Sequence, residues 1–206
     1  MEQNYDQFIG HYPGVLDQIW CSKIIDWFES KSDSHQLERK RYVNMVSVGS
    51  PQNHRSFAKL NLAVIKVLQR TFMRYRDKLG QGIQSPFHAT LDPKWKIQRS
   101  DPGKGYTGYH CEQGNKDYSR GRFLTWMIYL NDTVGGETEF KWQNRWYAPT
   151  RGDILIWPAA FTHMHHQKDN LKTKKYIATG WWVYDEELLK SFDQSVEEGV
   201  YKPPYV

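Results

Sequence analysis

Seven short segments in the second half of the chain combine hydrophobic residues with strand-like alternation. They are WKIQR, FLTWMIYL, ETEFKW, RWYAP, DILIWPA, HMHH and KYIATGWWVY. Their aromatic and β-branched residues favour the half-buried surface of a β-sheet. The stretches SDPGKG, NDTVGG, PTRGD and QKDN separate them and are rich in turn-forming residues. Several short strands spaced in this way predict an all-β sandwich or barrel in this part of the chain.

The first ninety residues have helical periodicity instead. The segment CSKIIDWF places Cys21, Ile24, Ile25 and Phe28 on one face of a helix. A second stretch, residues 56–79, repeats apolar residues at intervals of three or four. Its first residue, a serine, is a candidate N-cap, and the glycine that follows the stretch is a candidate stop signal. Between the two helices, RYVNMVSVG is typical of a strand.

Length and element pattern together predict one domain over residues 1–206. We expect a helical support region with one strand at 1–92, a jelly-roll catalytic core at 93–185 and a tail at 186–206. The fold class is therefore mainly β with flanking helices (α+β). Its core is expected to be a double-stranded β-helix, the cupin-like jelly roll, which is a common two-sheet architecture.

The composition excludes several classes of protein. The net charge is +5 and the pI about 9.0, but the basic residues are scattered without an arginine-rich run. This distribution favours surface solvation, or attraction of an anionic substrate, over nucleic-acid binding. Cys21 and Cys111 form no CxxC motif and no disulfide framework. The sequence shows neither a signal peptide nor a membrane span, so we expect a cytoplasmic protein.

The segment GYHCEQG contains a candidate metal site. His110 and Glu112 are two residues apart, so on a strand both side chains would point to the same face. A histidine from a distant segment would complete the 2-His-1-carboxylate arrangement of non-haem iron(II) oxygenases. The His-x-Glu pair is a weak signal alone, because such pairs also occur on protein surfaces.

Two downstream segments bear on the rest of this site. FTHMHHQ offers His163, His165 and His166, and on a strand the first two would share a face. Lys175 follows, and its neighbours on the same strand face are Ile177, Thr179 and Trp181. Burying a lysine among such residues is costly without an anion, which a dicarboxylate would supply. The alternative for Lys175 is an exposed position on an edge strand.

Together these segments resemble the prolyl-4-hydroxylase-like branch of the 2-oxoglutarate and iron(II)-dependent oxygenases. The resemblance spans roughly residues 95–184. It rests on HCE at 110–112, YLND at 129–132, GGETEF at 135–140, PTRGD at 149–153, His165, Lys175 and Trp181. The order and spacing of these elements single out His165 among the three neighbouring histidines, because Lys175 follows it by ten residues and Trp181 by sixteen.

The resemblance implies roles for individual residues. His110, Glu112 and His165 would be the catalytic metal ligands, and Lys175 would bind the far carboxylate of 2-oxoglutarate. The remaining candidates around the cosubstrate are Tyr129, Thr125, Met127, Gln98 and Trp181. Arg122 would either contact substrate or have a structural role. The glycines at 135–136 and the PTRGD segment would shape turns.

Three departures from the family pattern bear on the chemistry. Glu112 replaces the commoner aspartate but keeps the carboxylate, which favours hydroxylation over halogenation. Gln98 stands near the place of a tyrosine often found before the metal loop. Lys175 replaces the arginine of some relatives, so it offers a point charge instead of a bidentate fork. The implied cofactors are iron(II), 2-oxoglutarate and O2, with ascorbate as a further candidate.

The implied reaction couples oxidative decarboxylation of 2-oxoglutarate to hydroxylation of a C–H bond. The resemblance favours a prolyl residue in a peptide or protein, and the alternative is a free amino acid or another small molecule. The loops SDPGKGYTG and EQGNKDYSRGR flank the metal motif and are candidates for a substrate lid. Three other functions rank lower: a cupin-type metalloenzyme that does not use 2-oxoglutarate, a non-catalytic jelly-roll binding module, and nucleic-acid demethylation. The last is disfavoured because KTKKYIATGWW contains no arginine.

Overall fold

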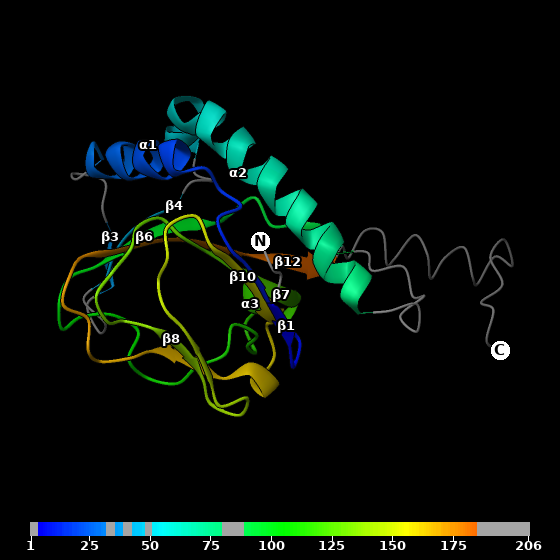
Figure 1. Cartoon of the computed structure of the whole chain (residues 1–206). Coiled ribbons are helices and arrows are strands. Elements are labelled where there is room, and N and C mark those ends of the chain that lie inside the picture. The colour runs from blue at the N-terminus through cyan, green and yellow to red at the C-terminus, as the bar shows by residue number, and fades with distance from the viewer. Residues whose placement is uncertain (1–3, 32–35, 39–42, 48–50, 80–88, 185–206) are drawn as a thin grey trace, which may run out of the picture.

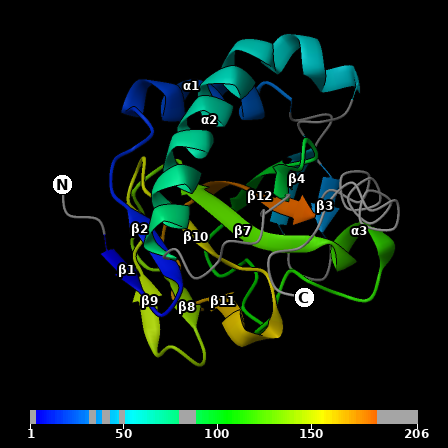
Figure 2. The same cartoon turned by 90° about the vertical axis from the view of Figure 1, so that its right-hand side faces the viewer.

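Two antiparallel sheets face each other, and two long helices cover the outer side of the larger sheet (Figure 1). The computed structural model describes residues 4–31, 36–38, 43–47, 51–79 and 89–184. Figure 2 shows the smaller sheet at the opposite end of the molecule from α1 (Gln18–Glu29). The expected mainly β fold with flanking helices is confirmed.

The larger sheet has nine strands within the described residues. Their order is β1 (Asn4–Asp6), β2 (Ile9–Tyr12), β10 (Ile154–Pro158), β7 (Arg122–Tyr129), β12 (Lys175–Tyr184), β6 (Lys96–Ser100), β4 (Val43–Ser47) and β3 (Gln36–Glu38), with β5 (Ala89–Leu91) paired to β12. The smaller sheet has the order β11 (His165–Gln167), β8 (Thr138–Phe140), β9 (Arg145–Tyr147). All strand pairs that join neighbours in the two sheets are antiparallel.

Each of the seven segments from 95 onward contains a strand, as the sequence predicted. The N-terminal part differs from expectation, because β1, β2, β3 and β5 were not foreseen. These strands have only three or four residues, which is too short to show a clear period-two pattern. β1 and β2 extend the larger sheet beyond β10, so the N-terminal region contributes to the sheet as well as to its helical cover.

The two helices begin for different reasons. Asp17 caps α1, since its side chain accepts a hydrogen bond of 2.7 Å from the backbone N–H of Ile19. The second helix, α2 (Pro51–Lys78), starts at a proline and not at Ser56, so the expected cap was wrong. Proline suits this first position because its ring presets the helical φ angle and its missing N–H is not needed there. The expected stop at Gly80 lies outside the described residues.

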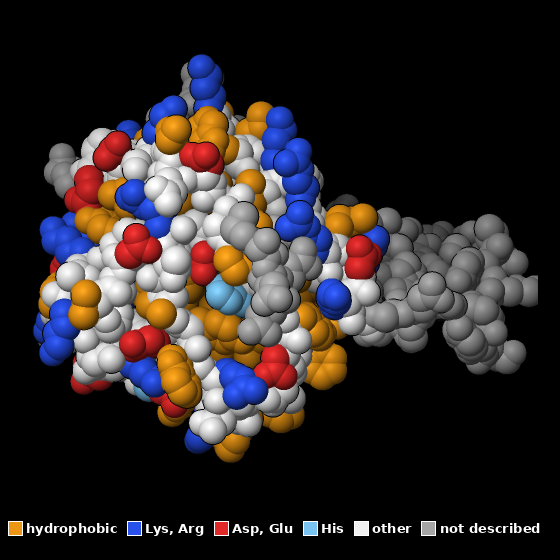
Figure 3. Space-filling view, in the orientation of Figure 1, with side chains coloured by type: hydrophobic (Ala, Val, Ile, Leu, Met, Phe, Trp, Pro, Cys, Tyr) orange, Lys and Arg blue, Asp and Glu red, His pale blue; other side chains and the backbone are white. Residues whose placement is uncertain are grey.

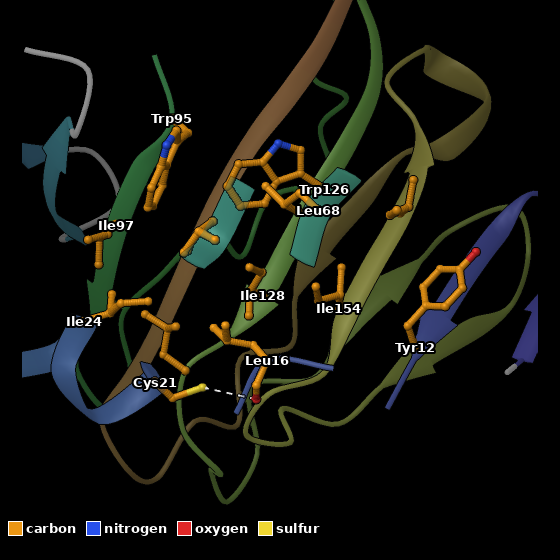
Figure 4. Packing of buried hydrophobic residues seen from close by; sticks show 14 of the residues in the cluster. Tyr12, Leu16, Cys21, Ile24, Leu68, Trp95, Ile97, Trp126, Ile128 and Ile154 are labelled. Carbon is orange, nitrogen blue, oxygen red and sulfur yellow. Dashed lines mark hydrogen bonds between the residues drawn. The ribbon is translucent and has the colours of Figure 1, made fainter. Parts of the chain in front are cut away.

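Residues on alternating sides of the central strands enter two different hydrophobic clusters. Three residues of β7 and the residue directly after the strand face the helices: Leu124, Trp126, Ile128 and Leu130. Figure 4 shows part of this cluster, including Trp126, Ile128, Leu68 and Ile24. The opposite side of the larger sheet faces the smaller sheet, where the second cluster comprises Ile9, Met127, Tyr129, Phe140, Leu155 and Trp157. Burial on both sides explains why FLTWMIYL is almost continuously hydrophobic.

A polar contact joins α1 to the sheet beside this core. Arg99 of β6 lies 3.1 Å from both carboxylate oxygens of Glu29, and the hydroxyl of Tyr176 donates to Glu29 at 2.7 Å.

The remaining helical segments are short, α3 (Asp117–Arg120) and η2 (Phe161–His163). No helix in the described ranges is long and hydrophobic enough to cross a membrane.

Substitution of Gly180 tests the packing between β12 and the helix-side core. A Cβ atom at this position would lie 2.6 Å from the Trp126 ring and 2.7 Å from Trp95 Cβ. Gly180→Ala should therefore lower the free energy of unfolding by ~1–3 kcal/mol, as overpacking of a core does. Urea denaturation would measure the change. The control is Gly121→Ala, where no atom lies within 4 Å of the added Cβ; equal stability of both variants would contradict the packing.

Candidate metal centre

Three side chains from two distant segments converge on one point. The ligand atoms of His110, Glu112 and His165 all lie within 4.8 Å of one another. Glu112 Oε1 is 3.5 Å from His110 Nε2 and 3.8 Å from His165 Nε2. A reciprocal pair of backbone hydrogen bonds, 3.0 and 2.9 Å long, joins residues 110 and 165 as an isolated β-bridge. This bridge explains how segments so far apart in sequence present their side chains to the same space.

Hydrogen bonds on the far side of each imidazole orient both rings. His110 Nδ1 lies 3.0 Å from the Gly108 carbonyl oxygen, and His165 Nδ1 lies 2.9 Å from the His163 carbonyl oxygen. A carbonyl only accepts, so Nδ1 carries the proton in both rings. Each Nε2 therefore presents a lone pair toward Glu112, which is the arrangement that metal-binding histidines adopt.

The two oxygens of Glu112 have separate partners. Oε1 faces the histidines, whereas Oε2 accepts hydrogen bonds from Trp181 Nε1 at 3.1 Å and from Arg122 at 3.2 Å. Arg122 also donates to the backbone carbonyl of Glu112 at 2.9 Å. Its guanidinium lies 3.4 Å from the centre of the Trp181 ring. These contacts hold the carboxylate so that one oxygen remains available to a cation.

The protonation states suit a divalent metal ion. Burial alone would raise the pKa of Glu112, but the adjacent His110, His165 and Arg122 outweigh it and hold that pKa at about 2. Burial, reinforced by His110, lowers the pKa of His165 to about 4. At neutral pH the cluster thus contains a carboxylate and a neutral imidazole. Metal binding requires these forms, because a protonated ligand cannot donate its lone pair.

The other two candidate histidines have different surroundings. His163 ends η2 and is buried, with Nε2 3.0 Å from the Gln7 carbonyl oxygen. His166 lies 3.2 Å from Glu139 and 2.9 Å from the Thr107 carbonyl oxygen. The expectation that 163 and 165 share a strand face was wrong, because β11 begins at residue 165. Within the described residues, only His165 of the three joins the cluster with His110 and Glu112.

A cavity of about 340 Å³ opens beside the three side chains. Figure 3 looks onto this face, with histidine atoms near its centre and hydrophobic side chains around them. The pocket-facing residues of β6 and β12 pair across the sheet, so the cavity lies against these two strands. The principal lining residues besides the three are Lys96, Gln98, Ser100, Tyr106, Arg122, Met127, Thr138, Trp157, His166, Gln167, Lys175, Ile177, Thr179 and Trp181.

Lys175 is buried at one end of this cavity. Its Nζ donates a 2.7 Å hydrogen bond to the carbonyl of Gly136 and lies 5.5 Å from the centre of the Tyr129 ring. Gly135 and Gly136 both have positive φ, so this turn depends on glycine to bring its carbonyl inward. Burial lowers the pKa of Lys175 to about 7, although Glu137 opposes the shift. An anion in the cavity would stabilise the charged form of this lysine.

The other predicted residues divide into two groups. Gln98, Met127 and Trp181 line the cavity. Tyr129 and Thr125 are buried without lining it, and the Tyr129 hydroxyl donates instead to Thr138 at 2.7 Å. Sequence reasoning missed the cavity positions of Thr138, Lys96 and Ser100. The period-two alternation of β6 around Gln98 was the signal that could have identified the last two.

Comparison with known proteins agrees with this geometry. Residues 95–183 match the family model described as the 2OG-Fe(II) oxygenase superfamily. No sequence among the curated proteins matches the chain significantly.

Solved structures of prolyl hydroxylases resemble most of the chain. The viral collagen prolyl hydroxylase of Paramecium Bursaria Chlorella virus-1, in its 2OG complex, has a TM-score of 0.62 and 20% identity over 85% of this chain and 96% of that one. A Pseudomonas putida prolyl-4-hydroxylase has a TM-score of 0.58 and 14% identity over 86% and 93%. A Trichoplax adhaerens prolyl hydroxylase has a TM-score of 0.63 and 18% identity over 89% and 87%. These likenesses identify the fold as the expected double-stranded β-helix.

Metal titration of histidine variants tests which side chains form the centre. We predict that His165→Ala weakens Mn(II) binding by more than about 100-fold, beyond the effect of losing an outer-shell partner. His163→Asn and His166→Asn should keep affinities within a few-fold of wild type, since neither ring points at the cluster. Isothermal titration calorimetry would give the three affinities. Loss of binding in His163→Asn with retention in His165→Ala would contradict the assignment.

Proposed function

We propose that this chain, whose residues 95–183 match the 2OG-Fe(II) oxygenase superfamily, hydroxylates prolyl residues in a peptide or protein substrate. The reaction would use iron(II) held by His110, Glu112 and His165, with 2-oxoglutarate anchored at Lys175. The observation that carries the proposal is the convergence of the three side chains at a cavity that also contains a buried lysine. Two imidazoles and one carboxylate are the donor set of non-haem iron(II) oxygenases and leave coordination positions open.

The family's cofactors are iron(II), 2-oxoglutarate and O2. When bound, they supply the oxidising power: the dicarboxylate is converted to succinate and carbon dioxide, and the substrate C–H bond becomes C–OH. The residues present fit both groups. The cluster offers two neutral Nε2 atoms and a carboxylate oxygen, and the dicarboxylate would provide the anion that Lys175 lacks. We propose ascorbate as an additional component that sustains turnover.

The side chains around the cluster orient and shield the reaction. Arg122 and Trp181 hold the second oxygen of Glu112, so the carboxylate keeps one orientation. Lys175 would bind the far carboxylate of the cosubstrate, and Tyr129 would position Thr138 beside it through their hydrogen bond. Trp157 packs edge-on against the His165 ring, with 5.0 Å between ring centres, and helps to exclude water. Exclusion of water strengthens each of these electrostatic contacts.

The choice of substrate rests on the similar solved structures. The similar solved structures are prolyl hydroxylases, and the Trichoplax adhaerens enzyme is in complex with a peptide fragment. A prolyl residue in a peptide is therefore the first candidate. Fold and ligand set do not determine substrate, which depends on the surrounding loops. Hydroxylation of a free amino acid or another small molecule is the second candidate.

A turnover assay separates these possibilities. Protein supplied with iron(II), 2-oxoglutarate, O2 and ascorbate should release succinate and add one oxygen atom to prolyl peptides, measured by mass spectrometry. His110→Ala and His165→Ala should abolish both products, whereas His166→Asn should keep them. Oxygen addition to a free amino acid and not to peptides would favour the second candidate. Iron-dependent chemistry without succinate would overturn the role of 2-oxoglutarate.

The pH dependence of 2-oxoglutarate binding tests the role of Lys175. The free protein loses the charge of this lysine as pH rises through about 7, whereas a bound dianion keeps it protonated. Affinity should therefore be constant below pH 7 and fall above it, by at most about tenfold per pH unit for one proton. Calorimetry on Mn(II)-loaded protein would measure this dependence. The Lys175→Met variant should bind 2-oxoglutarate weakly, and its affinity should not show this fall above pH 7. A wild-type affinity that rises above pH 7 would refute the role of Lys175.

A further inference from the structure

A second lysine lies at the end of the cavity away from Lys175. In the pairing of β6 with β12, Ser100 is opposite Lys175 and Lys96 is opposite Thr179. Both lysines line the cavity. Their backbone positions are four residues apart in strand register, which corresponds to about 13 Å along the strands at about 3.3 Å per residue. The cavity thus has a cation at each end, with the cluster of His110, Glu112 and His165 also on its lining.

In the proposed function, neither carboxylate of 2-oxoglutarate is available to Lys96. One would be anchored at Lys175, and the other end of the molecule would lie at the cluster of His110, Glu112 and His165. A cosubstrate anchored at Lys175 would therefore leave Lys96 unoccupied. By position, Lys96 faces the space that remains for the substrate.

The charges around Lys96 do not neutralise it. Glu112 is the only carboxylate among the described residues that line the cavity, against the cations Lys96, Arg122 and Lys175. Glu112 itself is engaged by Arg122 at 3.2 Å. Among the described residues, no carboxylate oxygen lies within 4.0 Å of Lys96 Nζ. The substrate end of the cavity therefore has an excess of positive charge.

A purely structural role for Lys96 explains these observations less well. Its Nζ lies 5.8 Å from the centre of the Trp181 ring, near the outer limit of about 6 Å for a cation–π contact. Arg122 already covers that ring at 3.4 Å. Trp181 is also held by its own hydrogen bond to Glu112. The ring is thus positioned without Lys96, which is only half-buried and can turn its ammonium group toward a ligand.

We propose that Lys96 forms a carboxylate-binding subsite for the substrate, so that the enzyme prefers a target bearing an anionic group close to the hydroxylated carbon. The inference rests on the proposed function, because it assumes that the substrate occupies this end of the cavity. The carboxylate would come from an aspartate or glutamate beside the target prolyl residue, or from a free chain terminus. Lysine suits either source, since its ammonium is a compact charge on a flexible stem.

Peptide binding to protein loaded with Mn(II) and 2-oxoglutarate tests the subsite without requiring turnover. The probes are a blocked Glu-Pro peptide against its Gln-Pro partner, and a prolyl peptide with a free C-terminal carboxylate against its amide. Wild-type protein should bind at least one carboxylate probe about tenfold more tightly than its neutral partner, or about 1.4 kcal/mol. Whichever pair shows the difference identifies the source of the carboxylate. The difference should shrink as ionic strength rises.

Variants assign this preference to Lys96. Lys96→Met should abolish the tenfold difference while leaving the neutral probe unchanged, and Lys96→Glu should favour the neutral probe. The matched control is Lys23→Met on α1, where another lysine lies 5.0 Å from a tryptophan ring, on the helix side of the sheet. Control protein should keep the wild-type difference.

Two outcomes overturn the subsite. One is that wild-type protein binds the carboxylate probe and its neutral partner with equal affinity in both pairs. The other is that Lys96→Met loses affinity for the carboxylate probe and the neutral probe by the same factor. Parallel measurement of succinate and hydroxylated product separates this failure from failure of the proposed function. If prolyl probes are hydroxylated without carboxylate preference, only the subsite is wrong. If no probe binds or is hydroxylated, the prolyl substrate assignment and the subsite both fall.

Discussion

The pairing of β12 with β7 on one side and β6 on the other is the constraint on which the rest of the structure depends. Antiparallel register alternates the side chains of β12 between two environments. Tyr176, Ala178 and Trp182 enter the helix-side core, whereas Lys175, Ile177, Thr179 and Trp181 line the cavity. A shift of one residue would exchange the two sets, so the burial that stabilises the sheet also determines which side chains face the site.

The polar groups on the cavity side are costly to bury, and Glu112 and Lys175 differ in how many polar or charged partners offset that cost. Glu112 is surrounded by cationic or polarisable partners that keep it ionised. Lys175 donates a hydrogen bond to the carbonyl of Gly136, and burial lowers its pKa to about 7. The site thus combines a carboxylate that is already oriented with a buried lysine that an incoming anion would stabilise. This combination agrees with a centre that binds a cation and a dicarboxylate side by side.

Much of the fold followed from local sequence patterns, because alternation and turn residues are read directly from the chain. The strands around FLTWMIYL and KYIATGWWVY were predicted in this way and are present as β7 and β12. The short strands β1 and β2 were not predicted, since β2 is stabilised by pairing with β10, and β1 by pairing with β2, and not by a pattern of their own. The 3-10 turn at Phe161–His163 was also missed, which made residues 163 and 165 look equivalent.

The sequence by itself determined the donor chemistry: a His-x-Glu motif, a distal histidine and a lysine at a spacing typical of one family. Only the tertiary structure decided how these residues are oriented. The bridge brings residues 110 and 165 together, and the hydrogen bonds of their Nδ1 atoms turn both Nε2 atoms toward Glu112. Arg122 and Trp181 hold the second oxygen of Glu112, so that the first faces the histidines. Sequence also did not distinguish Lys96 from other scattered lysines. Its position across from Thr179 depends on strand register, which arises from pairing between residues at least 75 positions apart.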